Sequence, residues 1–182
     1  MKKLLLVTLL LHCLLINGQN KTEPEKHLWL SSGLGCYGSN KTGGFTFDLD
    51  LEQINYTNTS KIKLCYSDEL NLFGPSPSER YLELDFLSGK SYPLGFLRIS
   101  ALGGLGLMVT KTRTNLIENP DGFWGYNTYE TKVGVTPCVP VEINISGFLF
   151  HESFEIGLTG FGNLNFISAQ AGIMIKLGIK MN

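Results

Sequence analysis

The chain has 182 residues, a formal net charge of −1 at pH 7 and 43% hydrophobic residues. A nearly neutral chain gives no electrostatic reason to expect nucleic-acid binding, and the length is sufficient for one domain with a complete core. After residue 18 the cysteines are Cys36, Cys65 and Cys138. Their odd number and wide spacing predict neither a disulfide framework nor a metal or redox site, so we expect no cofactor.

The first residues predict a secretory signal peptide at 1–18. Two lysines precede an apolar run from Leu4 to Ile16, and the small residue Gly18 follows. This is the order of a charged region, an apolar region and a cleavage site. The run is short for a membrane-spanning helix, which needs roughly 20 residues. We therefore expect cleavage near Gly18 and one mature domain over 19–182.

Alternation of apolar and polar residues recurs along the rest of the chain, which predicts strands rather than helices. The second segment is typical, because Phe45, Phe47 and Leu49 alternate with Thr46 and Asp48. We count eight such segments, at 28–37, 44–53, 60–66, 80–88, 95–111, 128–145, 153–162 and 168–180. The pattern predicts an all-β up-and-down meander.

The connections between these segments alternate in length. Those after the third and fifth segments are long, whereas those after the second, fourth and sixth are tighter. Long and short connections at opposite ends are typical of transmembrane barrels. In the sixth segment, Pro137 and Pro140 each remove a backbone donor, so we expect a bulge or a local opening near Cys138.

Alternation alone does not tell which face lies inside. A soluble lipocalin-like barrel has its apolar face inside, and a membrane barrel has it outside. The polar face carries charges of both signs, as an enclosed ion-pair network requires. It also carries glycines, such as Gly33, Gly104 and Gly106, that leave room for long side chains in a narrow barrel. Nearly all aromatic residues lie in connections or near strand ends, as in membrane girdles. These features favour a polar lumen and a lipid-facing exterior.

The candidate lumen residues are acids and bases on the polar faces of the predicted strands. The ion-pair candidates are Asp48, Asp50, Lys61, Lys63, Glu83, Asp85, Arg98, Glu142, Glu155 and Lys176. The same faces carry Glu52, Lys132 and Lys180. A short turn near 90–92 would place Arg98 close to Glu83 and Asp85.

Three segments resemble the small outer-membrane β-barrel proteins abundant in the Bacteroidetes: LELDFLSGKSYPLGFLRISALGGLGLMV, VGVTPCVPVEINI and IGLTGFGNLN. Those proteins have the general shape of the OmpA and OmpX barrels. The resemblance implies an eight-stranded antiparallel transmembrane β-barrel in the bacterial outer membrane. It also implies contact with outer-membrane lipid and with the barrel assembly machinery. Many outer-membrane proteins end in an aromatic residue, whereas this chain ends in Lys180-Met181-Asn182.

The expected function is that of a non-enzymatic outer-membrane barrel with a plugged polar lumen and a structural or surface-interaction role. Eight strands leave no aqueous channel. Contact with an envelope or external partner is expected through the connections 67–79 and 112–127, with the aromatic candidates Phe73, Phe123, Trp124 and Tyr126.

Two alternatives are open from the sequence. The sequence His151-x-Ser153, followed by Glu155, is similar to the catalytic pattern of PagL-type lipid A deacylases, in which a base activates a hydroxyl nucleophile. The predicted topology places this segment on the periplasmic side, away from a substrate in the outer leaflet. The other alternative is a soluble periplasmic lipocalin-like binder.

Overall fold

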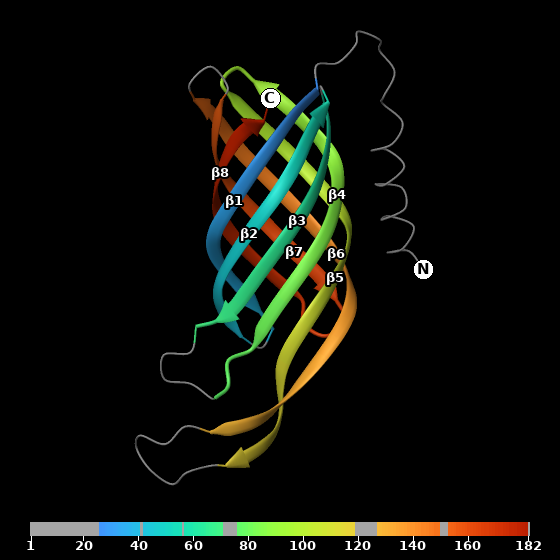
Figure 1. The fold of residues 1–182 in the computed structure, drawn as a ribbon, viewed down its shortest axis with the longest axis vertical. Coiled ribbons are helices and arrows are strands. Elements are labelled where there is room, and N and C mark those ends of the chain that lie inside the picture. The colour runs from blue at the N-terminus through green and yellow to red at the C-terminus, as the bar shows by residue number, and fades with distance from the viewer. Residues whose placement is uncertain are drawn as a thin grey trace.

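The computed structural model describes residues 26–40, 42–55, 57–70, 76–118, 127–149 and 153–181. The predicted signal peptide at 1–18 lies outside these ranges. The strands are β1 (Lys26–Ser39), β2 (Gly43–Asn55), β3 (Asn58–Glu69), β4 (Arg80–Leu94), β5 (Leu97–Glu118), β6 (Thr128–Leu149), β7 (Phe154–Asn165) and β8 (Gln170–Met181). Each strand pairs antiparallel with the next, and β1 pairs with β8, so the strands form a closed barrel (Figure 1). The predicted eight-stranded all-β fold is confirmed.

Alternate residues of each strand lie inside and outside the barrel, because successive side chains of a strand point to opposite faces. On β2, Phe45, Phe47 and Leu49 are exposed on the outer surface, whereas Thr46 and Asp48 are buried. Most buried residues of the barrel are polar or charged, and most large apolar side chains are exposed. The lipocalin-like alternative is therefore wrong, since it requires the apolar face inside. Among the described residues, no helix has the length and apolar character to span a membrane.

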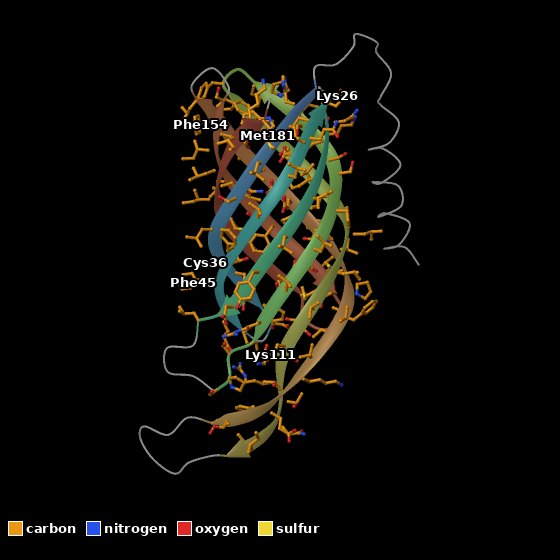
Figure 2. The ribbon with its side chains drawn as sticks, viewed as in Figure 1. Lys26, Cys36, Phe45, Lys111, Phe154 and Met181 are labelled. Carbon is orange, nitrogen blue, oxygen red and sulfur yellow. The ribbon has the colours of Figure 1, made fainter. Side chains whose placement is uncertain are left out.

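The two ends of the barrel differ. The connections that follow β1, β3, β5 and β7 lie at one end, here called the loop end, and Lys26 and Met181 lie at the opposite turn end (Figures 1 and 2). β5 and β6 continue past the loop end as a twisted ribbon, since their outer neighbours β4 and β7 end earlier. We call residues 112–118 and 128–137 the projecting hairpin. Residues 112–118, predicted to be loop, are thus strand.

The prolines of β6 fit without a shift of register. The β5–β6 register is the same on both sides of Pro140, where two pairs are missing from the ladder. Pro137 lies one residue beyond the last β6–β7 pair, at Cys138, so that side of β6 has no partner strand there. The expected opening near Cys138 is present, and the register shifts lie instead in the hairpin, between residues 113 and 118.

The turn between β4 and β5 lies later in the chain than the predicted position at 90–92. β4 continues through that position, and the chain reverses at Gly95, whose φ of 66° favours glycine. Arg98 therefore lies at the turn end, far along the ladder from Glu83 and Asp85. The prediction that Arg98 lies close to these two carboxylates is wrong.

Candidate functional site: the charged lumen

Every strand except β1 contributes to a group of buried charged side chains in the lumen. The predicted ion-pair candidates found there are Asp48, Asp50, Lys61, Lys63, Glu83, Asp85, Arg98, Glu142, Glu155 and Lys176. Glu52 is buried with them. Lys132 is exposed because the projecting hairpin leaves the barrel, and Lys180 is partly exposed at the turn end. Lys180 keeps the lumen-facing side of the alternation, opposite the buried Trp29, whereas the expectation that Lys132 lies in the enclosed interior is wrong.

The centre of the lumen is an ion-pair cluster around Glu142. Lys61 Nζ lies 3.0 Å from Glu142 Oε2, and Lys63 Nζ lies 2.8 Å from Oε1. One carboxylate of β6 thus joins two ammonium groups of β3 across the lumen. Lys61 also pairs with Glu52 at 3.2 Å, and Lys63 pairs with Asp85 at 3.1 Å. Glu52 and Asp85 lie directly opposite these lysines on the neighbouring strands, so the strand register itself sets these two pairs.

Lys176 on β8 joins two carboxylates of β2 by reaching past β1. Its Nζ lies 3.6 Å from Asp48 Oδ2 and is in close contact with Asp50 Oδ2. The β1 residue opposite both Asp48 and Lys176 is Gly33. A Cβ at Gly33 would lie 3.2 Å from Asp48 Cγ and 3.3 Å from Lys176 Cγ, which is closer than ordinary packing allows. The missing side chain therefore provides the space in which this ion pair forms.

Arg98 and two aromatic rings cover the ion-pair cluster at the turn end. Arg98 Nη2 lies 2.7 Å from Glu155 Oε2 and 3.3 Å from Glu52 Oε1. The guanidinium carbon lies 5.8 Å from the ring centroid of Trp29 and 5.0 Å from that of Phe148. A cation over an aromatic face gains electrostatic attraction in addition to its ion pairs. The turn end is thus filled by a paired cation that lies against two neighbouring rings, whose centroids are 5.3 Å apart.

A second, apolar layer lies toward the loop end. It consists of Tyr37, Tyr81, Met108 and Cys138, with Phe161 packed against them. The rings of Tyr37 and Tyr81 meet edge to face, with their centroids 6.0 Å apart. The sequence reasoning missed both covering layers. The available signal was the position of Trp29, Tyr37 and Tyr81 on the otherwise polar face of the alternation.

Arg113 holds the base of the projecting hairpin against the loop end of the barrel. Its Nη2 donates to Glu69 Oε1 at 2.8 Å, and its backbone N donates to Glu79 Oε1 at 3.1 Å. The hydrogen bond to Glu69 raises the pKa of the Arg113 guanidinium above its ordinary value. A backbone bridge from Ser76 to the start of β6 adds a second contact. No periodic pattern in the sequence indicates this clamp, because Glu69 ends β3, Glu79 precedes β4, and Arg113 lies on the part of β5 that leaves the barrel.

Glu83 is held by an amide rather than by a cation. Its Oε2 accepts a hydrogen bond from Asn163 Nδ2 at 2.6 Å, and no basic side chain of the described residues lies within ion-pair distance.

Cys65 and Cys138 are free and buried nearby in the lumen. Within the described ranges, no group of three or more His, Cys, Asp or Glu side chains is arranged to hold a metal ion.

The enzyme-like sequence is only partly described. His151 lies outside the described residues, and Ser153 lies in the turn before β7 at the turn end. Glu155 points into the lumen, where it binds Arg98 and accepts a hydrogen bond from Asn144 Nδ2 at 3.4 Å. The aromatic loop candidates also lie outside the described residues: Phe73, Phe123, Trp124 and Tyr126.

No known family model and no curated protein sequence matches the chain. Solved structures match over most of its length. Neisserial surface protein A has a TM-score of 0.64 at 7% identity, covering 86% of this chain and 97% of its own. Ail, the attachment invasion locus protein of Yersinia pestis, has a TM-score of 0.53 at 11% identity. The match covers 88% of this chain and 100% of Ail. The N-terminal β-barrel domain of Pseudomonas aeruginosa OprF has a TM-score of 0.55 at 10% identity, covering 85% and 97%.

These similarities concern the fold, since the sequence identities are low. The chain shares the eight-stranded architecture of outer-membrane barrels, and the expected OmpA- and OmpX-like shape is confirmed. The resemblance to the proteins of the Bacteroidetes stays a prediction.

Proposed function

We propose that the chain is an integral barrel of a bacterial outer membrane, with a filled polar lumen and a structural or surface-interaction role. One observation carries the proposal. Around the middle of the barrel, the outer faces of the described strands carry no charged side chain, and charged groups are gathered inside. The charged residues on the outer faces lie toward the two ends, among them Asp68, Arg80 and Lys111 at the loop end and Lys90 at the turn end. An apolar exterior of this extent is unfavourable in water and favourable in a lipid bilayer. The similar solved structures are outer-membrane proteins, which supports the same location.

We infer the orientation from the connections. The longer connections and the projecting hairpin lie at the loop end, whereas Lys26 and Met181 lie at the turn end. In membrane barrels the long loops face the outside and the short turns face the periplasm. The hairpin and the connections at 67–79 and 112–127 would then reach an envelope or external partner. Insertion would use the barrel assembly machinery, after removal of the signal peptide near Gly18.

The test is the behaviour of the protein in isolated membranes. A closed, folded barrel resists unfolding by detergent at room temperature, so we expect faster gel migration before boiling than after. The protein should also stay in the membrane through a carbonate wash. Release by carbonate, or identical migration of boiled and unboiled samples, would contradict the proposal. Intact-mass measurement of the same material tests cleavage near Gly18.

A non-enzymatic role is proposed because Glu155, the carboxylate of the enzyme-like sequence, is bound to Arg98 inside the lumen. The hydroxyl of Ser153 lies at the turn end, which the proposed orientation places in the periplasm. Lipid A should therefore have the same mass spectrum with and without expression of the protein. Loss of an acyl chain that depends on expression, and on Ser153, would favour the deacylase alternative.

A further inference from the structure

The outer surface of the barrel carries a basic pair where its apolar face ends at the loop end. Arg80 of β4 and Lys111 of β5 lie directly opposite each other in the ladder, and both side chains point outward. Figure 2 shows Lys111 at the base of the projecting hairpin, at the opposite end from Lys26 and Met181. Below the pair, the outer faces of the same two strands are apolar at Leu82 and Val109.

Two like charges directly opposite each other on a sheet are unfavourable unless an anion lies between them. The described residues provide one carboxylate, Asp68, whose Oδ2 lies 3.2 Å from Arg80 Nε. That contact uses Arg80 Nε and leaves the two terminal guanidinium nitrogens available to another anion. The side chain of Arg80 is 52% exposed. Lys111 has no ion-pair partner among the described residues. The three side chains therefore carry one uncompensated positive charge.

We propose that Arg80 and Lys111 bind the phosphate of a membrane lipid headgroup, an inference that rests on the proposed membrane location. Arginine offers planar paired donors to a phosphate, and lysine adds a compact point charge. The acyl chains of the same lipid would lie along the outer strip formed by Leu82, Leu84, Leu107 and Val109, all of which are exposed. Tyr66 lies beside the pair, with its hydroxyl donating to Asp68 Oδ2 at 3.0 Å.

A bound lipid satisfies both parts of this surface at once, which a soluble anion does not. Inorganic phosphate would neutralise the basic pair and leave the strip beneath it without a specific occupant. A neutral lipid would cover the strip and leave the charges unpaired. The combination of two basic groups and a continuous apolar strip on the same two strands is the chemistry of a phosphorylated lipid.

The test measures which lipid lies beside the strip in the folded barrel. The variant Leu107→Cys with Cys36→Ala has one accessible thiol, because Cys65 and Cys138 are buried. A fluorophore on this thiol is compared in phosphatidylcholine vesicles that contain either brominated phosphatidic acid or brominated phosphatidylcholine at the same mole fraction. We expect stronger quenching by the phosphatidic acid, and excess inorganic phosphate should leave that preference unchanged.

Charge variants in this labelled background identify the residues responsible. Arg80→Gln with Lys111→Gln should lower the preference for phosphatidic acid roughly tenfold or more, the effect expected for lost charge-assisted hydrogen bonds. Lys111→Gln alone should give a smaller loss, and Lys111→Arg should keep the preference. The matched control is Lys132→Gln, which removes the same charge at the loop end from a site on the hairpin without the apolar strip. Gel migration before boiling verifies that each variant is folded.

Four outcomes separate the possibilities. Equal quenching by the two brominated lipids would overturn the lipid site while leaving the membrane location intact. Loss of the preference in excess inorganic phosphate would show a site for soluble anions and overturn the proposal. An equal loss in Lys132→Gln would show a general effect of surface charge and would also overturn the proposal. Quenching by neither lipid would contradict the proposed function itself.

Discussion

Each cation of the lumen serves more than one carboxylate. Lys61 contacts Glu52 and Glu142, and Lys63 contacts Asp85 and Glu142. The described lumen holds more carboxylates than basic groups, so the cations are the scarce partners. Loss of one cation leaves at least two carboxylates underpaired in a place that excludes water. Substitution of a cation should therefore destabilise the barrel more than substitution of a carboxylate.

Arg98→Leu tests, at the turn end, how much the loss of one lumen cation destabilises the barrel. We expect the free energy of unfolding in lipid vesicles to fall by about 3–5 kcal/mol, since Glu52 and Glu155 lose their shared partner. Urea titration measures the change. A double-mutant cycle with Glu155→Gln should give a coupling energy of about 0.5–3 kcal/mol. The same cycle with Glu83→Gln should be additive, and coupling to Glu83 instead would contradict the observed pairing.

The two faces of the barrel should respond in opposite ways to a larger side chain at a glycine. Gly33→Val would push a branched side chain into the contact between Asp48 and Lys176, so we expect a loss of about 1–3 kcal/mol. Gly160→Val places the same side chain on the outer face, where the nearest atom to a Cβ is the Ile143 backbone oxygen at 4.0 Å. Valine suits a strand better than glycine, so this control should be neutral or stabilising. Similar losses at both sites would contradict the assignment of inside and outside.

At the scale of the strands, alternation of residue types predicted which elements form and which face each side chain takes. It did not locate the strand ends. Gly89, Ser91 and Pro93 look like turn residues, yet β4 runs through all three and the turn forms at Gly95, where the backbone needs a positive φ. The segment 112–118 was predicted to belong to a connection, and in the structure it has no third strand beside it. The two arms of the hairpin pair with each other instead, so each provides the backbone hydrogen-bond partners of the other.

Leu105→Arg tests the lipid-facing surface of β5. Leu105 is 71% exposed in the middle of the outer face, so we expect a loss of about 2–4 kcal/mol in a bilayer. Val133 is 66% exposed on the projecting hairpin, beyond the barrel. Val133→Arg should lower the free energy of unfolding much less, because water surrounds that residue in the proposed orientation. Equal costs, measured by urea unfolding in vesicles, would place the two residues in one environment and contradict the lipid assignment.

The clamp at Arg113 should control the projecting hairpin and leave the barrel unaffected. Arg113→Ala removes the contacts to Glu69 and Glu79, so the hairpin base should open more often. We expect several-fold faster cutting by proteinase K within the hairpin, with an unchanged urea midpoint for the barrel. Lys132→Ala is the control for charge loss in the same ribbon. An unchanged cutting rate in Arg113→Ala would show that the Ser76 bridge suffices to hold the hairpin.

For the whole molecule, the set of lumen residues follows from alternation, but their partners do not. Lys61 and Glu142 are brought together by the tilt and closure of the barrel, which no local pattern encodes. Glu52 and Lys61 are ladder neighbours and depend on the register of one hairpin alone. The error in placing the β4–β5 turn was therefore enough to assign Arg98 the wrong partners. Sequence reasoning can predict the ion pairs within a hairpin when it places the turn correctly.

The filled lumen predicts that the folded protein does not conduct ions freely. The ion-pair cluster lies between the Arg98 layer and the apolar layer around Tyr81, so no continuous water path is expected. Planar bilayers that contain the purified, folded protein should show no steady porin-like conductance. A parallel gel verifies that the sample is folded. Stable, reproducible conductance steps from folded protein would contradict the plugged lumen.

The pairing of β1 with β8 sets the order of events in synthesis. The strand made first shares its ladder with the strand made last, so the barrel stays open until Gln170–Met181 has left the ribosome. Until then β1 and β7 each present an unpaired edge that invites pairing with other chains. Asp48 and Asp50 also lack their contact with Lys176 until β8, which carries this lysine, is in place. The barrel can therefore close only when β8 is present, and this one strand both completes the wall and supplies the cation that pairs with Asp48 and Asp50.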